Sequence, residues 1–303
     1  MGIILILAAS CFASLSNFCM RRSIDSGGTA RAFLTVQLSI ATLAAFLLGP
    51  VRTGEFDVNL PVIAAGITAG LVLGWMLQTL GRALECGPPG LTFAMLNAST
   101  VMPAIIMALF FGAAYGCIYT PWHAIGSLFV LAGLFWAGKG LQGLASARAW
   151  ILFSLLTFSL HVLFLVIMQC RVLVLNSSMA SLASDLANPW FLFFIYLAAA
   201  ALQAGIYLTK ERRVPKSDEG FYGLFGGIGN AMSTFFLIWA TEAASALERA
   251  VIFPIFSIAI IVICNLWGQR LYQEKVHWKA CQLCLLGLFI GTVDWGSLFK
   301  VFM

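Results

Sequence analysis

The sequence predicts an all-α integral membrane protein: ten transmembrane helices in two inverted five-helix repeats around a central cavity. Of its 303 residues, 61% are hydrophobic and only 10% are charged, whereas a soluble domain carries roughly a quarter charged residues. The apolar residues also fall into runs of about 20, the length that crosses a bilayer as a helix. Because ten such runs are too many for one soluble core, we expect lipid to surround them.

Each predicted span lies between breaks that combine charge with turn-forming residues. In the first half these breaks include RRSIDSGG, GPVRTGEFD and ECGPP, and in the second half TKERRVPKSDE and QRLYQEK. All but one of the loops are short, so we expect no extramembrane domain. The ten predicted spans are 2–20, 30–49, 60–82, 89–111, 121–138, 150–170, 187–208, 220–243, 247–268 and 278–296.

Ten spans divide into two sets of five, residues 1–138 and 150–303, joined by a connecting loop at 139–149. An odd number of spans puts the second set into the membrane upside down relative to the first, which is how many transporters are built. Short matches support this division. GRALECGPPG resembles WATEAASALE, which pairs Glu85 with Glu242, and at nearly the same offset Trp122 pairs with Trp278.

Four segments carry a family resemblance: SLSNF at 14–18, ALECGPPGLTFAMLNASTVMPAI, ALERAVIFPIF, and YQEKVHWKACQLCLLGLFIG with Glu274 at its acidic position. In these segments the chain resembles the drug/metabolite transporter superfamily, in its ten-helix EamA-like branch. The resemblance implies a basket of helices around a central cavity that carries a small metabolite. Gly116-Cys117 stands where the family often has Gly-Glu, and Ser14 where Trp is common, which indicates a divergent member.

Polar side chains within the spans indicate where a substrate would bind, because an unpartnered polar group in hydrocarbon is costly. Large amides and an imidazole need several partners, which a wet cavity supplies. Charged groups near the span ends, Glu274 among them, are expected to reach the interface or to pair across turns. The alternative is that the uncharged polar groups join helices by hydrogen bonds. The predicted substrate-binding residues are Asn17, Trp75, Gln78, Asn97, His161 and Asn230, with Arg82 and Arg249 at the mouth for an anionic or zwitterionic group.

These features predict a secondary transporter that moves a small polar metabolite, such as an amino acid, nucleoside or sugar derivative, by alternating access. Proton-coupled drug efflux is an alternative, but it needs a carboxylate deep in the membrane, and no Asp or Glu lies near the middle of any predicted span. A non-transporting scaffold or receptor subunit is a second alternative. Coupling to protons or other ions stays open.

An enzyme is not expected, because the three histidines are scattered and form no catalytic cluster. We also expect no cofactor. His277, Cys281 and Cys284 would share one helix face as metal ligands could, but cysteine is a common apolar filler in such helices. The net charge of +5 is spread over short loops, which argues against a nucleic-acid partner. The expected partners are a small-molecule substrate and the lipid bilayer.

The distribution of basic residues predicts the orientation, and a bacterial inner (plasma) membrane is the expected location. Thirteen of the seventeen lie in or beside the odd-numbered loops, which the positive-inside rule places in the cytoplasm, with both termini outside. The family resemblance implies the opposite, termini inside. The thirteen are Arg21, Arg22, Arg31, Arg82, Lys139, Arg148, Lys210, Arg212, Arg213, Lys216, Arg270, Lys275 and Lys279; the other four are Arg52, Arg171, Arg249 and Lys300.

Overall fold

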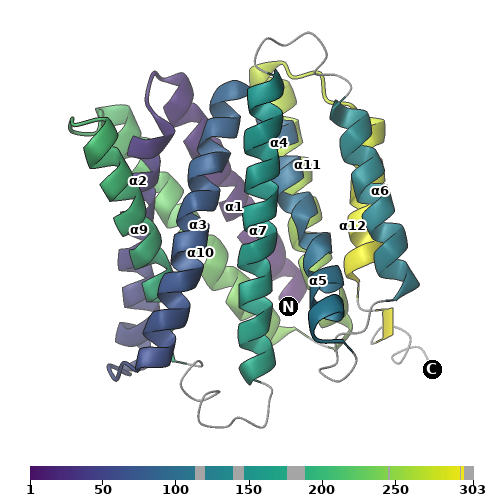
Figure 1. Ribbon diagram of the computed structural model, residues 1–303, viewed down its shortest axis with the longest axis horizontal. Coiled ribbons are helices and arrows are strands. Elements are labelled where there is room, and N and C mark those ends of the chain that lie inside the picture. The colour runs from purple at the N-terminus through teal and green to yellow at the C-terminus, as the bar shows by residue number, and fades with distance from the viewer. Residues whose placement is uncertain (113–119, 139–146, 176–187, 245, 294, 297–303) are drawn as a thin grey trace.

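The computed structural model describes residues 1–112, 120–138, 147–175, 188–244, 246–293 and 295–296, and all regular structure in this part of the chain is helical (Figure 1). The helices are α1 (Gly2–Asp25), α2 (Ala30–Phe46), the π-helical turn η1 (Leu47–Val51), α3 (Leu60–Cys86), α4 (Pro89–Ala98), the 3₁₀ turn η2 (Ser99–Val101), α5 (Met102–Phe110), α6 (Pro121–Gly138), α7 (Ala147–Leu175), α9 (Trp190–Lys210), α10 (Ser217–Ala243), α11 (Ala246–Tyr272) and α12 (Trp278–Thr292).

Eight helical segments are long and apolar enough to cross a membrane, so the chain is a multi-pass membrane protein as predicted. Two further apolar helices, α6 and α12, are shorter. Each predicted span coincides with a helix, and some helices run past the predicted ends, as α1 does to Asp25. The predicted span 89–111 is broken into α4, η2 and α5. Pro103 lies at the start of α5, where its missing N–H interrupts the helical hydrogen bonds.

Four turns lie together at one end of the bundle, which we call the first-turn end: α1–α2, α3–α4, α9–α10 and α11–α12. Contacts between distant segments place them there. The Thr29 N–H in the α1–α2 turn donates to Glu219 at the start of α10, 2.8 Å away. The Gly90 N–H at the start of α4 donates to Glu274 in the α11–α12 turn, 3.0 Å away. The guanidinium of Arg21 lies 5.3 Å from the ring centre of Tyr272 and so links the two pairs.

The opposite end carries the N-terminus and the α2–α3 loop. The amino group of Met1 lies 3.0 Å from the Glu248 carboxylate, beside the start of α11. Asn188, just before α9, donates through Nδ2 to the carbonyl of Asp57, just before α3, at 2.7 Å. Therefore α3 and α9 both begin at this end, whereas α2 and α10 begin at the first-turn end.

Glycines allow several helix pairs to pack closely. On α3, Gly66 and Gly70 face α9, and a Cβ placed on Gly70 would lie only 2.3 Å from the carbonyl oxygen of Ile195. On α10, Gly223 and Gly227 face α2 at similarly short distances. Interfaces of small residues are typical of membrane helices, because packing replaces the hydrophobic effect as the driving force.

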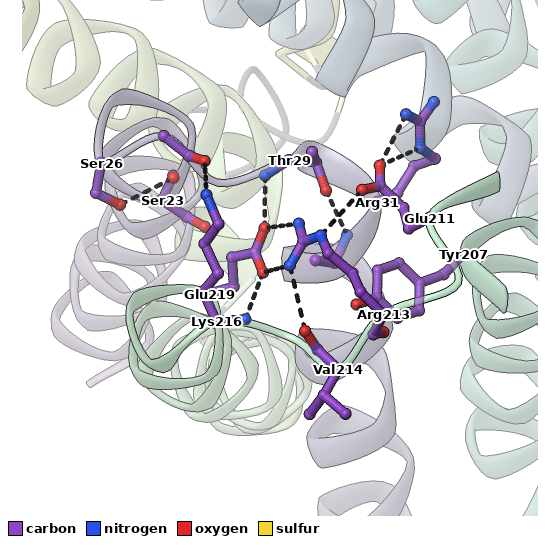
Figure 2. A network of polar contacts seen from close by, with 12 residues as sticks. Ser23, Ser26, Thr29, Arg31, Tyr207, Glu211, Arg213, Val214, Lys216 and Glu219 are labelled. Atoms are coloured by element: carbon purple, nitrogen blue, oxygen red, sulfur yellow. Dashed lines mark hydrogen bonds and ion pairs between the residues drawn. The ribbon is translucent and has the colours of Figure 1, made fainter.

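A chain of ion pairs ties the α1–α2 turn to the α9–α10 turn, and Figure 2 shows how its side chains converge. Arg31 pairs with Glu211 at 2.8 Å, Glu211 with Arg213 at 3.3 Å, and Arg213 with the fully buried Glu219 at 2.6 Å. Burial on its own raises the pKa of the Glu211 carboxyl, but the hydrogen bond and charge of Arg31 and the charge of Arg213 hold the pKa below its usual value. This arginine–glutamate chain joins the two halves of the sequence at the first-turn end.

Candidate functional site

A seam of polar contacts runs where α7 meets α3 and α4. The Trp150 indole N–H donates to Thr92 Oγ1 at 2.8 Å, linking α7 to α4. Farther along α7, Thr157 donates to Thr79 Oγ1 on α3 at 2.9 Å. Because α7 belongs to the second half of the sequence and α3 and α4 to the first, we call this line of contacts the polar seam between the halves.

His161 lies on the same seam, against the irregular turn between α4 and α5. Its Nδ1 lies 2.6 Å from Ser99 Oγ and 2.9 Å from the carbonyl oxygen of Leu96. A carbonyl can only accept, so Nδ1 carries the hydrogen in the bond to Leu96, and Nε2 of the neutral ring is then an acceptor. The 3₁₀ turn at 99–101 therefore orients the imidazole.

Three predicted amides come from α1, α3 and α4. Asn97 is buried and donates to the Phe93 carbonyl of its own helix at 2.8 Å. Asn17 on α1 reaches Cys264 Sγ on α11 at 3.8 Å. Gln78 Oε1 on α3 is buried and has no hydrogen-bond partner among the described residues. A buried acceptor without a partner costs stability, and it is the kind of atom that a ligand or water would satisfy.

Trp75 lies elsewhere than expected. Its side chain is 50% exposed on the outer face of α3, so it faces outwards and not into the bundle. This corrects the prediction that Trp75 lines a substrate site. Arg82, predicted at the mouth, pairs with Glu85 one turn away at 2.9 Å on the surface of α3.

Asn230 contacts α9 and not the seam. Its Nδ2 donates to the hydroxyl of Tyr196 at 3.4 Å, and that hydroxyl also bonds Thr234 at 2.9 Å. This local contact holds α10 to α9. The side chain of Arg249, the other predicted mouth residue, lies outside the part of the chain that the structure describes.

A cavity of about 580 Å³ lies at the first-turn end, among α4, α6, α11 and α12. Its size is within the range of small-molecule sites. The sequence predicted a cavity near the bilayer midplane, and this one lies closer to one surface. It is lined by Arg21, Gly87, Pro88, Pro89, Leu91, Ala94, Leu134, Ala137, Ile261, Asn265, Tyr272, Glu274, Lys275, Val276, His277, Cys281 and Cys284.

Glu274 reaches this cavity because of how α11 ends. After Tyr272, Gln273 adopts a left-handed conformation with φ of 51°, which reverses the chain. The Glu274 N–H then donates to the carbonyl of Gly268, six residues back, at 3.3 Å. A left-handed residue just after a helix is a common way for the helix to end, but this bond spans one residue more than that of a Schellman motif. The reversal turns the Glu274 side chain back over the end of α11, where Oε2 accepts from the Gly90 N–H.

Two glycines make room for the Glu274 carboxyl. A Cβ on Gly90 would lie 2.7 Å from Oε2, and one on Gly268 would lie 2.9 Å from the same atom. The other oxygen, Oε1, is buried without a hydrogen-bond partner among the described residues. Burial raises the pKa of Glu274 to about 7, although the Gly90 N–H bond and the charge of Arg21 act in the opposite direction. Glu274 is thus a carboxyl that titrates near neutral pH at a cavity wall.

His277, Cys281 and Cys284 line the same cavity, as their shared helix face predicted. His277 Nδ1 accepts from the Ala280 N–H at 3.4 Å and so caps the start of α12. Among the described residues, no three His, Cys, Asp or Glu side chains are arranged to hold a metal ion. Cys284 Sγ lies 3.5 Å from the Val130 carbonyl oxygen, in the contact of α12 with α6.

Comparisons with known proteins address the fold. No family model and no curated protein matches this sequence. A solved structure, described only as the crystal structure of a protein, matches with a TM-score of 0.62 and 16% identity, covering 96% of each chain. The fold is a known one. At this identity the match shows only that the fold is similar, and the similarity extends over nearly the whole length of both chains.

Sequence reasoning placed Glu274 at the membrane interface and missed its cavity. The residue that docks it, Gly90, lies 184 positions earlier in the chain. A local signal was present in the helix-ending segment QRLYQEK. There the carboxylate follows directly after the last turn of a helix, where a left-handed residue can fold it back.

Proposed function

We propose that this chain is a secondary transporter that moves a small polar metabolite, such as an amino acid, nucleoside or sugar derivative, across the membrane by alternating access. We further propose that it is a divergent EamA-like member of the drug/metabolite transporter superfamily and resides in a bacterial inner membrane. The proposal depends on ten spans in two inverted repeats. The observation that carries it is that helix contacts in one half recur, residue by residue, in the other.

The helix starts recur at a constant separation. The starts of α3 and α10, of α4 and α11, and of α6 and α12 are each 157 residues apart (60 to 217, 89 to 246 and 121 to 278). In addition, α3 and α10 both contain 27 residues. Two unrelated halves would have no reason to keep the same spacing across three helices and their turns.

The close glycine contacts recur as well. Gly70 on α3 lies against the carbonyl of Ile195 on α9, and Gly227 on α10 lies against the carbonyl of Gln37 on α2. The two glycines are 157 residues apart (70 to 227), and the two carbonyls are 158 apart (37 to 195). The Gly66–α9 and Gly223–α2 contacts follow the same correspondence. The same packing solution therefore occurs once in each half.

The matched helices run in opposite directions. α3 begins beside Asp57 at the end of the bundle that carries the N-terminus, whereas α10 begins beside Thr29 at the first-turn end. This favours halves related by about half a turn around an axis in the membrane plane. In transporters of this design the substrate site lies where the repeats meet. The polar seam, with His161, lies at that junction; Gln78 and Asn97 lie on α3 and α4, the first-half helices of the seam, and Asn17 joins the halves through α1 and α11.

The test compares two buried glutamines of the same chain. Neither Oε1 atom has a hydrogen-bond partner among the described residues, but Gln203 Nε2 donates to the Gly74 carbonyl across the α3–α9 contact at 2.7 Å. A metabolite library is screened by thermal shift, since a ligand that binds only the folded state raises the melting temperature. Uptake of the hits is then measured in proteoliposomes.

We expect Gln78→Met and His161→Leu to abolish transport and the ligand-induced rise in melting temperature. Gln78→Met should leave the melting temperature without ligand nearly unchanged. Gln203→Met should instead lower that temperature, with transport per folded molecule retained. If Gln78→Met behaves like Gln203→Met, Gln78 only joins helices. If no metabolite shifts the melting temperature and none is transported, the chain is better explained as a scaffold or receptor subunit.

A further inference from the structure

The α11–α12 turn, residues 273–277, forms one wall of the 580 Å³ cavity, and Glu274 attaches this wall to α4. We propose that the Glu274 carboxyl is a proton-binding site whose proton keeps the α11–α12 turn docked on α4, so that loss of the proton opens the cavity at the first-turn end. The role of this opening in transport rests on the function proposed above. The binding of the proton and the opening of the cavity do not.

The docked carboxyl fits its surroundings better as a neutral acid than as an anion. The glycine notch of Gly90 and Gly268 holds the side chain at close range, but it supplies one N–H donor, to Oε2. Oε1 is buried and accepts no hydrogen bond from the described residues. The start of α4 favours a negative charge, but only modestly. An ionised carboxylate surrounded by water gains far more donors, and so ionisation favours the undocked side chain.

The charge of Arg21 offsets this preference only in part. Arg21 lies 3.1 Å from Asp25 on its own helix and also donates to the Leu84 carbonyl, so most of its charge is already balanced. Lys275 and His277 are exposed on the same turn. The charged or titratable groups that line the cavity with Glu274 are Arg21 from α1, Tyr272 from α11, Lys275 and His277 from the turn, and Cys281 and Cys284 from α12; the lining residues from α4 and α6 are not titratable.

The sign of the pH effect follows from linkage. The pKa of Glu274 is about 7 when docked and would be near its ordinary value of 4.5 in water. Docking therefore binds a proton, and the ratio of open to closed protein rises with pH between these two values. The rise is at most about tenfold per pH unit and roughly 300-fold in total, and it levels off above pH 7. Acid closes the cavity and alkali opens it.

Infrared difference spectroscopy on the purified protein can observe the proton directly. We expect the band of a protonated carboxyl group to disappear with a midpoint near pH 7 and to be absent in Glu274→Gln. The matched control is Glu85→Gln, a carboxylate near the same end that pairs with Arg82 outside the cavity, and it should keep the band. A Glu274 band that titrates below pH 5 would overturn the proposal.

Cys281 and Cys284 report on opening, since both are buried at the cavity wall in this structure. Their alkylation by an uncharged maleimide is measured by peptide mass spectrometry from pH 5 to 8. Dividing each wild-type rate by the Glu274→Gln rate removes the pH dependence of the thiols themselves. We expect this ratio to rise at least tenfold towards pH 7 and then to level off, with Glu85→Gln tracking the wild type. A ratio that stays at one contradicts the opening.

A second variant covers the case in which Glu274→Gln does not fold. Gly90→Ala places a Cβ 2.7 Å from Glu274 Oε2 and should expel the carboxyl. In Gly90→Ala, Cys281 and Cys284 should be alkylated at every pH as fast as in the open wild type, after each rate is divided by that of a free thiol at the same pH. Slow alkylation would contradict the proposal.

Transport is measured separately. If liposomes show no transport while these results hold, the proposed function fails and the proton site stands. If transport by Glu274→Gln has the same pH dependence as transport by the wild type, the proton-controlled opening has no role in transport.

Discussion

Glu219 and Glu274 show how the donors around a carboxylate decide what it does. Glu219 accepts hydrogen bonds from both terminal nitrogens of Arg213, at 2.7 and 2.6 Å, and from the backbone N–H groups of Thr29 and Lys216. Glu274 accepts from one backbone N–H group. With its donors complete, Glu219 fixes the α9–α10 turn in place, whereas Glu274 is held loosely enough to be released.

The Glu219 arrangement predicts a large effect of a small change. In Glu219→Gln one carboxylate oxygen becomes an NH₂ group, so the N–H donors that pointed at an acceptor now face another donor. Breaking a buried ion pair in this way costs about 3–5 kcal/mol, so we expect a clear fall in the melting temperature of the purified protein. The neighbouring exposed Asp218→Asn should change stability by less than about 0.5 kcal/mol. Equal melting temperatures for the two variants would show that the arginine–glutamate chain does not stabilise the fold.

Among the elements, the α6–α12 pair depends most on glycine. Gly126 and Gly133 on α6 face Gly287, Gly291 and Cys284 on α12, and Figure 1 shows the two helices side by side at one edge of the bundle. A Cβ on Gly126 would lie 2.3 Å from the Cα of Gly291. Neither backbone can yield without separating the helices.

Gly126→Ala is therefore expected to lower the melting temperature by pushing α12 away from α6. The control is Gly205→Ala on α9, where a Cβ would meet nothing within 4 Å. There alanine should be neutral or stabilise the helix by up to about 1 kcal/mol. Both variants are compared in one detergent, and the same response in the two would mean that α6 and α12 do not depend on their close approach.

For the whole molecule, the gathering of four turns at one end makes the orientation testable. The loops that hold most of the basic residues include these turns, so we expect the first-turn end to face the cytoplasm. Val214 in the α9–α10 turn is 84% exposed, and Thr53 is exposed at the opposite end. With the other cysteines replaced, a membrane-impermeant maleimide should label Thr53→Cys in intact cells and Val214→Cys only after lysis. The reverse pattern would put both termini inside, as the family resemblance implies.

The sequence was sufficient for the membrane class and for the positions of the helices, because long apolar runs bounded by charge have few other solutions. It did not settle which way the helices face. When both lipid and protein interior are apolar, a helix such as α3 carries little pattern to show its buried side, and Trp75 was placed inwards although it is half exposed. Likewise, Asn230 was assigned to a shared cavity, but it bonds to Tyr196 on the neighbouring α9.

The short α12 has a consequence for the surrounding lipid. Its 15 residues rise only about 22 Å at 1.5 Å per residue, against roughly 30 Å for a bilayer's hydrocarbon core. Tryptophans mark both ends of this edge, since the ring centres of Trp122 and Trp295 lie 5.3 Å apart and those of Trp136 and His277 lie 5.0 Å apart. Indole rings settle at headgroup depth. We therefore expect hydrophobic mismatch at the α6–α12 edge to thin the membrane locally, so that this edge favours lipids with short acyl chains.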